Sequence, residues 1–178
     1  MKNKFFIILF TLCFFINANS EEEIIFKASE INILDEGNLV EAKNGSEVIL
    51  PDNITITSEE FKYNKLDSLL EFNKKILAED KINDLKLKTE KLEYLKNKKI
   101  INTFGKTTFL IQSGYIINSK NITYNKKKEL LFSKEKSKIT DTFNNQINVD
   151  EFSYFLNNLI FQFLILDHLF YLQLKCFD

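Results

Sequence analysis

The amino-acid sequence predicts an all-β protein made of antiparallel sheets, and three observations support this fold class. First, a short apolar motif occurs five times at a nearly constant interval, led by Ile31, Phe61, Leu92, Ile122 and Phe152; such regularity indicates stacked repeats. Second, apolar and polar residues alternate around each motif, as in strands with one buried face. Third, turn-forming residues separate these segments and no helical periodicity supplies crossover connections, so neighbouring strands are expected to be antiparallel.

The segment 1–20 has the pattern of a cleaved secretory signal peptide. Lys2 and Lys4 form a basic start, residues 5–16 are an apolar run of 12, and residues 18–20 offer the small side chains that precede a cleavage site. An apolar run of this length is too short to cross a bilayer. We therefore expect cleavage before Glu21 and an exported protein.

The composition of the mature chain excludes several classes of function. The chain keeps 22 lysines, no arginine and 25 acidic residues, a net charge of −3, so it has no basic field that would hold a nucleic acid. One cysteine (Cys176) and one histidine (His168) remain. These two residues allow neither an internal disulfide nor a histidine–cysteine metal cluster.

Each repeat contains three alternating segments, which we interpret as strands. The first segment precedes the motif and carries paired apolar residues: Ile24 and Phe26, Ile54 and Ile56, Leu85 and Leu87, Tyr115 and Ile117, and Ile147 and Val149. The second is the motif itself. The third begins nine residues after the motif, at Val40 and Ala42, Leu70 and Phe72, Ile101 and Thr103, and Leu131 and Ser133. Two facing sheets that share one apolar interior satisfy this pattern.

Two kinds of turn are expected in each repeat. One follows the motif directly, at residues 35–38, 64–67, 96–99 and 125–128, where Asn, Asp, Gly and Lys gather. A second is marked by Gly45, Lys75, Gly105 and Lys136. The interval from Phe61 to Leu92 is one residue longer than the others, and the extra residue lies between Phe72 and Leu85. This insertion predicts a longer or bulged turn there.

At Asn157 the pattern breaks, so we divide the chain into a signal peptide (1–20), a β domain (21–155) and an apolar tail (156–178). Residues 159–172 show neither the repeat spacing nor turn residues, and their length predicts a short helix of about 14 residues. Gln162, Asp167 and His168 make this segment a poor membrane span. Three alternatives stay open for the tail: it lies on the domain, it lies on a membrane surface, or a truncation or frameshift has put it in place of a longer C-terminal region.

Catalytic residues are not apparent, and we do not expect an enzyme or a bound cofactor or metal. Adjacent carboxylates such as Glu59 and Glu60, or Asp150 and Glu151, point to opposite faces of a strand and cannot act as a paired acid and base. The chain also contains no glycine-rich phosphate-binding loop.

The sequence resembles the OstA-like family, which includes LptA and the N-terminal domain of LptD. The resemblance rests on the leader, on residues 26–31 and 39–42, and on repeats that end with Tyr, Asn and a charged turn. The likeness covers residues 24 to about 155, although the family's turn is degraded at residues 42–45. It implies a V-shaped β-jellyroll in the periplasm that carries the acyl chains of lipopolysaccharide during outer-membrane assembly. The groove would then be lined by Ile31, Ile33, Phe61, Tyr63, Leu92, Tyr94, Ile122 and Tyr124. If the tail replaced a longer region, the parent would be LptD-like.

The resemblance also implies partners, since members of this family add end to end through strand edges. The edge candidates are Ile24, Phe26, Ile147, Val149, Phe152 and Tyr154, and the partners would be lipopolysaccharide or another acyl lipid and further jellyroll domains. From the residues alone, the closed core of a sandwich is the favoured interpretation of the same apolar side chains, because periodicity tells which face is buried and not what covers it. A β-repeat protein that self-assembles into a surface fibre is the alternative function, and a β-solenoid enzyme is a weaker third.

Overall fold

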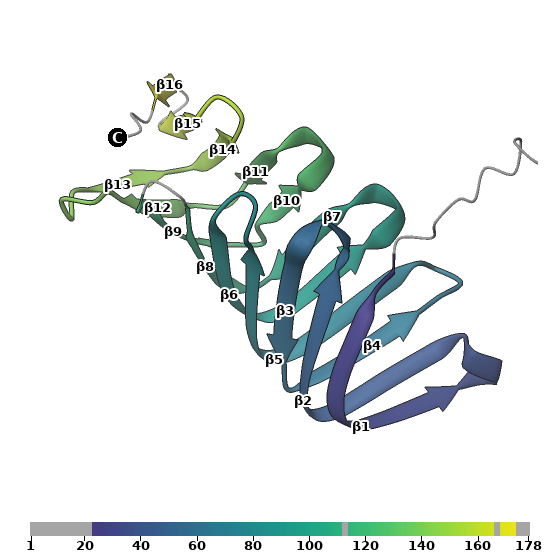
Figure 1. Cartoon of the computed structure of the whole chain (residues 1–178). Helices are drawn as coiled ribbons and strands as arrows, with labels where there is room; N and C mark the ends of the chain where they lie inside the picture. The colour runs from purple at the N-terminus through teal and green to yellow at the C-terminus, as the bar shows by residue number, and fades with distance from the viewer. Residues whose placement is uncertain (1–22, 112–113, 166–167, 174–178) are drawn as a thin grey trace, which may run out of the picture.

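The computed structural model describes residues 23–111, 114–165 and 168–173, and the predicted signal peptide lies outside these residues. The described part is almost entirely antiparallel β-structure, with 16 strands and four short 3-10 turns. The molecule is elongated: β1 lies at one end, and β13 and β16 lie at the other (Figure 1). The predicted all-β class is therefore confirmed.

The strands and turns have the following bounds. The strands are β1 (Ile25–Leu34), β2 (Leu39–Leu50), β3 (Ile54–Ser58), β4 (Glu60–Asn64), β5 (Leu69–Asp80), β6 (Leu85–Leu95), β7 (Ile100–Phe104), β8 (Lys106–Leu110), β9 (Ile116–Lys120), β10 (Thr123–Asn125), β11 (Leu130–Ser133), β12 (Ser137–Thr140), β13 (Gln146–Val149), β14 (Glu151–Phe155), β15 (Ile160–Ile165) and β16 (His168–Gln173). The 3-10 turns are η2 (Asp35–Gly37), η3 (Pro51–Asn53), η4 (Lys96–Lys98) and η5 (Lys126–Lys128).

The strands form two walls that meet along one side, because the long strands run through both. The C-terminal half of β2 pairs with β3, whereas its N-terminal half pairs with β4. In the same way β5 pairs with β3 and β4, and β6 pairs with β8 and β7. We call the half that contains β3, β8, β9, β12 and β13 the first wall. The half that contains β4, β7, β10, β11, β14, β15 and β16 is the second wall.

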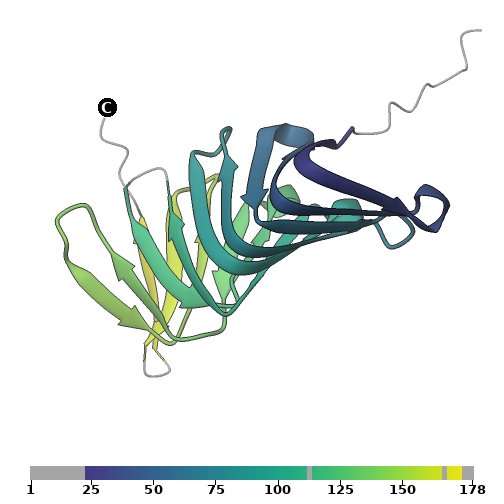
Figure 2. The same cartoon turned by 90° about the horizontal axis from the view of Figure 1, so that it is seen from below.

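The two walls make the predicted V-shaped jellyroll, and each repeat is two antiparallel strands bent at the apex. The strands curve continuously through this bend (Figure 2). Chain-reversing turns lie at the free border of each wall, which we call its rim. The rim of the first wall carries η3, and the rim of the second wall carries η2, η4 and η5.

The positions predicted as second turns are bends rather than chain reversals, which corrects that prediction. Gly45 and Gly105 have φ angles of 98° and 79°, and Lys75 has 48°. These left-handed conformations let a strand change direction while the ladder continues on both sides, as at the register shift between Asn73 and Ile76. Lys136 lies in the equivalent segment between β11 and β12.

The rim turns follow one local design. Asn64 and Asn125 follow the repeat tyrosines, and each side chain accepts a hydrogen bond from a backbone N–H within its turn. The longer turn predicted between Phe72 and Leu85 is confirmed: four residues separate the paired Asp80 and Leu85, against three between Leu50 and Ile54. The side chains of Asn64 and Asn125 close their turns, as the residue composition of these segments indicated.

The helix predicted for residues 159–172 is wrong, because the described part of this segment forms the hairpin β15–β16. β15 pairs with β14 and continues the second wall past residue 155. Phe161 and Phe163 are buried while Gln162 alternates with them, and they follow Phe152 by nine and eleven residues, as in the other repeats. The open border of β14 recruits this apolar, aromatic segment as a further strand.

Candidate functional site

The space between the two walls is the candidate site, and most of it is filled by side chains of the chain itself. Of the predicted groove residues, Phe61, Tyr63, Leu92, Tyr94, Ile122 and Tyr124 point between the walls and are at most 8% exposed. Phe61 stacks on Phe26 of the first wall at 5.1 Å between ring centroids, and its ring is 6.1 Å from that of Phe72. One continuous apolar cluster extends along the molecule, from Val40 to Phe163.

The interior opens to solvent at the end that carries β1. Ile31 and Ile33 belong to the predicted groove, yet they are 43% and 69% exposed. Within the described residues, β1 pairs only with β2, so its outer border is an edge. Phe26 lies on this edge strand and Ile24 directly precedes it; both are half-buried against the core. An apolar opening and a free strand edge therefore coincide at this end.

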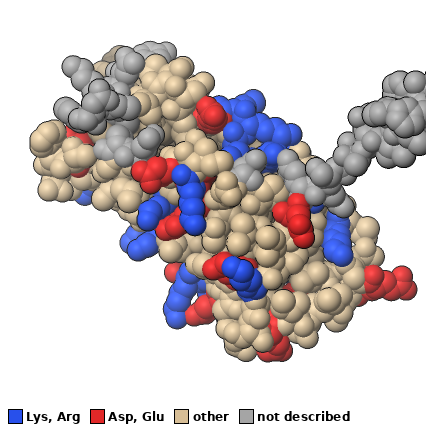
Figure 3. Space-filling model, viewed as in Figure 1, with Lys and Arg blue, Asp and Glu red and all other residues tan. Residues whose placement is uncertain are grey.

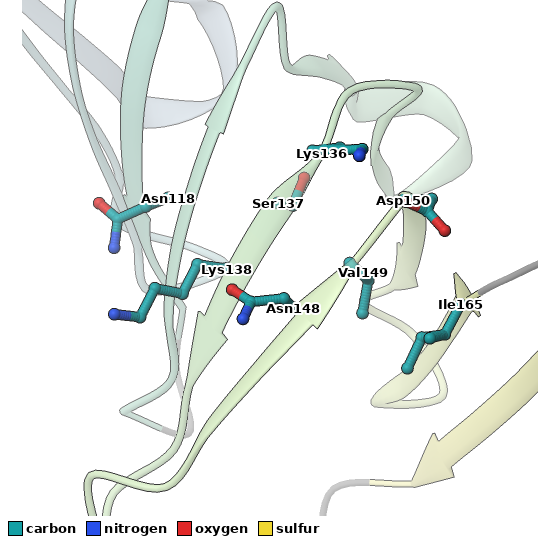
Figure 4. A pocket seen from close by; sticks show the side chains of 8 residues that line it. All are labelled: Asn118, Lys136, Ser137, Lys138, Asn148, Val149, Asp150 and Ile165. Carbon is teal, nitrogen blue, oxygen red and sulfur yellow. The ribbon is translucent and has the colours of Figure 1, made fainter.

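The opposite end has edges at β13 and β16. Ile147 and Val149 lie on β13, which pairs only with β12 among the described strands. Phe152 and Tyr154 do not lie on an edge, because β14 pairs with β11 on one side and β15 on the other; their assignment as edge residues is wrong. A hollow of about 370 Å³ opens here, with Val149, Ile165 and Lys138 among its lining residues (Figure 4).

A row of buried hydroxyl groups follows the bend between the walls. Ser46 and Ser58 hydroxyls lie 2.9 Å apart, and the Thr107 hydroxyl donates to Thr103 at 2.9 Å. The same pattern continues at the next bend, where Ser137 donates to Ser119 at 2.7 Å. Buried hydroxyls require such partners, and these bonds also satisfy backbone groups where the ladder bends. The alternation pattern placed these residues in strands but did not indicate this network.

Asp80 is the buried charged residue of the described chain, and it joins the two walls across their open side. It lies at the first-wall rim with only 3% of its side chain exposed, and its Oδ2 accepts hydrogen bonds from Tyr124 Oη at 2.8 Å and Lys126 Nζ at 2.5 Å, both on the second wall. Asn83 Nδ2 donates to the same oxygen at 2.9 Å, and two backbone N–H groups donate to Oδ1. We call Asp80, Asn83, Tyr124 and Lys126 the latch.

The environment of the latch favours the charged carboxylate and the neutral phenol. Burial raises the pKa of Asp80, but hydrogen bonds from Lys126, Asn83 and Tyr124 outweigh burial and hold it below its usual value. Burial raises the pKa of Tyr124, and the neighbouring Asp80 charge raises it further. Tyr124 therefore remains a hydrogen-bond donor to an ionised Asp80 at neutral pH.

Beneath the latch the walls leave a cavity of about 10 Å³, lined by Asp80, Tyr124 and apolar side chains such as Leu87 and Phe109. That is room for about one water molecule and for no acyl chain. Counted from the start of the motif, Asp80 occupies the place that Leu50, Ile111 and Asp141 hold in the other repeats. Asp141 bonds only to residues of its own turn, so the contact of Asp80 with the second wall does not follow from its place in the repeat.

The rim of the second wall is basic beside the latch. η5 consists of three lysines, Lys126 to Lys128, and the neighbouring turn contributes Lys96 and Lys98. Figure 3 shows lysines gathered over the η5 turn.

No helix among the described residues is long and apolar enough to cross a membrane.

Comparison with solved structures identifies the fold. The chain is similar to LptH from Pseudomonas aeruginosa, the LptA homologous periplasmic component of a lipopolysaccharide transport device, with a TM-score of 0.57 at 10% identity over 72% of this chain and 94% of that one. The TCP10 domain of CPAP from Danio rerio gives a TM-score of only 0.16 at 9% identity, covering 79% of this chain and 93% of that one. This score is too low to indicate a shared fold. No family model and no curated protein matches the sequence. The chain therefore has the predicted LptA-like jellyroll fold.

Proposed function

We propose that this protein binds the acyl chains of lipopolysaccharide between its two walls and passes the lipid on in the periplasm. The observation that carries the proposal is the unbroken apolar interior, which reaches solvent at Ile31 and Ile33. The predicted leader, the fold shared with LptH and its periplasmic role support the same compartment and ligand class. No catalytic group is needed, because transfer of an acyl chain from water is favourable by about 0.8 kcal/mol per methylene.

Binding requires the walls to separate, because the interior is filled by side chains. Continuous strands hold the walls together at the bend, whereas side chains alone connect them at the rims. The rims are therefore the side that opens. Separated walls would expose apolar surface, and the entering acyl chains would cover that surface again.

We further propose that the protein adds end to end onto another jellyroll domain. The free border of β1 provides unpaired backbone groups, and Ile31 and Ile33 beside it provide apolar contact. The edges of β13 and β16 at the opposite end complete the pair of surfaces that such an array needs. A continuous interior would then run from one copy to the next. The alternative function, a lipid-independent fibre, uses the same edges.

Replacing Ile33 at the open end by Asp is expected to weaken lipopolysaccharide binding about tenfold or more, because a carboxylate would have to be desolvated against the acyl chains. The measurement is equilibrium titration of the mature protein with fluorescent lipopolysaccharide. Asn32→Asp is the matched control: it adds the same charge to the same strand on its other face, and it should bind like the wild type. Polymerisation without lipid and indifference of the wild-type protein to added lipid would favour the fibre instead.

A further inference from the structure

We propose that the latch is a gate on the open side of the V, which the anionic head group of a bound lipid opens by taking Lys126 from Asp80. The inference rests on the proposed lipid-binding function and assigns its regulation. Asp80 is the last residue of β5, whereas Tyr124 and Lys126 come from β10 and η5, so the contact bridges the two rims.

The position of the latch makes it an obstacle. A lipid with its chains between the walls keeps its polar head outside, so the link between chains and head must pass between the rims. Asp80 and Lys126 close that gap in the middle of the molecule, and the cavity beneath them holds about one water molecule. Chains therefore cannot pass this point along the interior while the latch is closed.

The chemistry of the latch suits exchange of partners. The Lys126 side chain is 13% exposed and lies on a turn, so its ammonium group can turn outward to a phosphate or carboxylate of a lipid head group. Asp80 would keep the donors of Tyr124, Asn83 and two backbone N–H groups, so that opening does not leave a bare buried carboxylate.

A permanent staple is the competing interpretation, and the length of the turn argues for a more specific role. The turn after Asp80 contains the one inserted residue of the repeat region, and Asn83 within it bonds both Asp80 and Tyr124. These contacts hold the carboxylate in place independently of Lys126. The lysine is thus the replaceable member.

The test compares Lys126→Met with Lys127→Met, which removes the same charge from the same turn without touching Asp80. Each mature protein is mixed with pyrene-labelled lipopolysaccharide or with pyrene-labelled diacylglycerol, which has no charge, and the rate of uptake is followed. Spin labels at Ile82→Cys and Lys128→Cys, in a Cys176→Ser background, report the distance between the rims.

The gate predicts that Lys126→Met takes up both lipids about tenfold faster, since a charge-assisted hydrogen bond no longer holds the rims. It also predicts wider rim distances in this variant. Uptake of diacylglycerol should be slower than uptake of lipopolysaccharide in the wild type but not in Lys126→Met. Lys127→Met should behave like the wild type.

Equal rates for Lys126→Met and the wild type would overturn the gate while leaving lipid binding intact. Equal uptake of the charged and uncharged lipids by the wild type would overturn opening by the head group. Failure of every form to take up either lipid would contradict the proposed function instead. In that case the rim distances still test whether the latch holds the walls together, and an unchanged distance in Lys126→Met would overturn the latch.

Discussion

Phe61→Ala is expected to lower the free energy of unfolding by about 3–5 kcal/mol, the usual cost of deleting a buried aromatic ring. Phe61 is 2% exposed and its ring lies between those of Phe26 and Phe72. Its removal opens a cavity where the two walls meet behind the edge strand β1. Urea denaturation followed by circular dichroism measures the change.

Leu66→Ala is the control for Phe61→Ala, because Leu66 lies at the tip of a rim turn with 74% of its surface exposed. Its effect should stay within about 0.5 kcal/mol. A small loss in Phe61→Ala would contradict the packed interior, and would indicate walls that already stand apart.

Asp80→Asn is expected to lower the free energy of unfolding at pH 7 by about 2–4 kcal/mol, because the neutral amide no longer neutralises Lys126 and brings a surplus donor among five existing ones. Asp84→Asn, on the same turn but exposed, is the matched control and should change stability little. Equal effects of the two substitutions in urea denaturation would show that the latch does not join the walls.

The stability difference between wild type and Asp80→Asn should also depend on pH. The folded-state pKa of Asp80 lies below its unfolded value of about 3.9, so its stabilisation is complete above that value and is lost as pH falls through the folded-state pKa. The two proteins should therefore begin to converge below about pH 4, as Asp80 becomes protonated in the folded wild type. A gap that persists at low pH would mean that charge is not what holds the latch.

Much of this fold follows from periodicity alone. Phe61, Leu92 and their equivalents are buried because alternation within a repeat tells which face of each strand meets the core. The bends were not predictable in this way: Gly45 and Gly105 favour any left-handed conformation, and only pairing on both sides distinguishes a bend from a reversal.

Two further features depend on context that local patterns do not contain. The segment around Phe161 is apolar enough for a helix, and the open border of β14 decides that it becomes a strand. The partners of Asp80, Tyr124 and Lys126, belong to a later repeat, far away in the chain. Tertiary contacts of this kind become visible only once the walls face each other.

Site-specific photo-crosslinking shows whether lipid acyl chains occupy the space between the walls. A photoreactive phenylalanine analogue is placed at Phe61 or Tyr94, which point inward, and at Lys62 or Glu93, which alternate with them on the outer face. After illumination with lipopolysaccharide, we expect strong labelling at the two inner positions and none at the two outer ones. Equal labelling at all four positions, or labelling at the outer pair alone, would contradict this placement of the acyl chains.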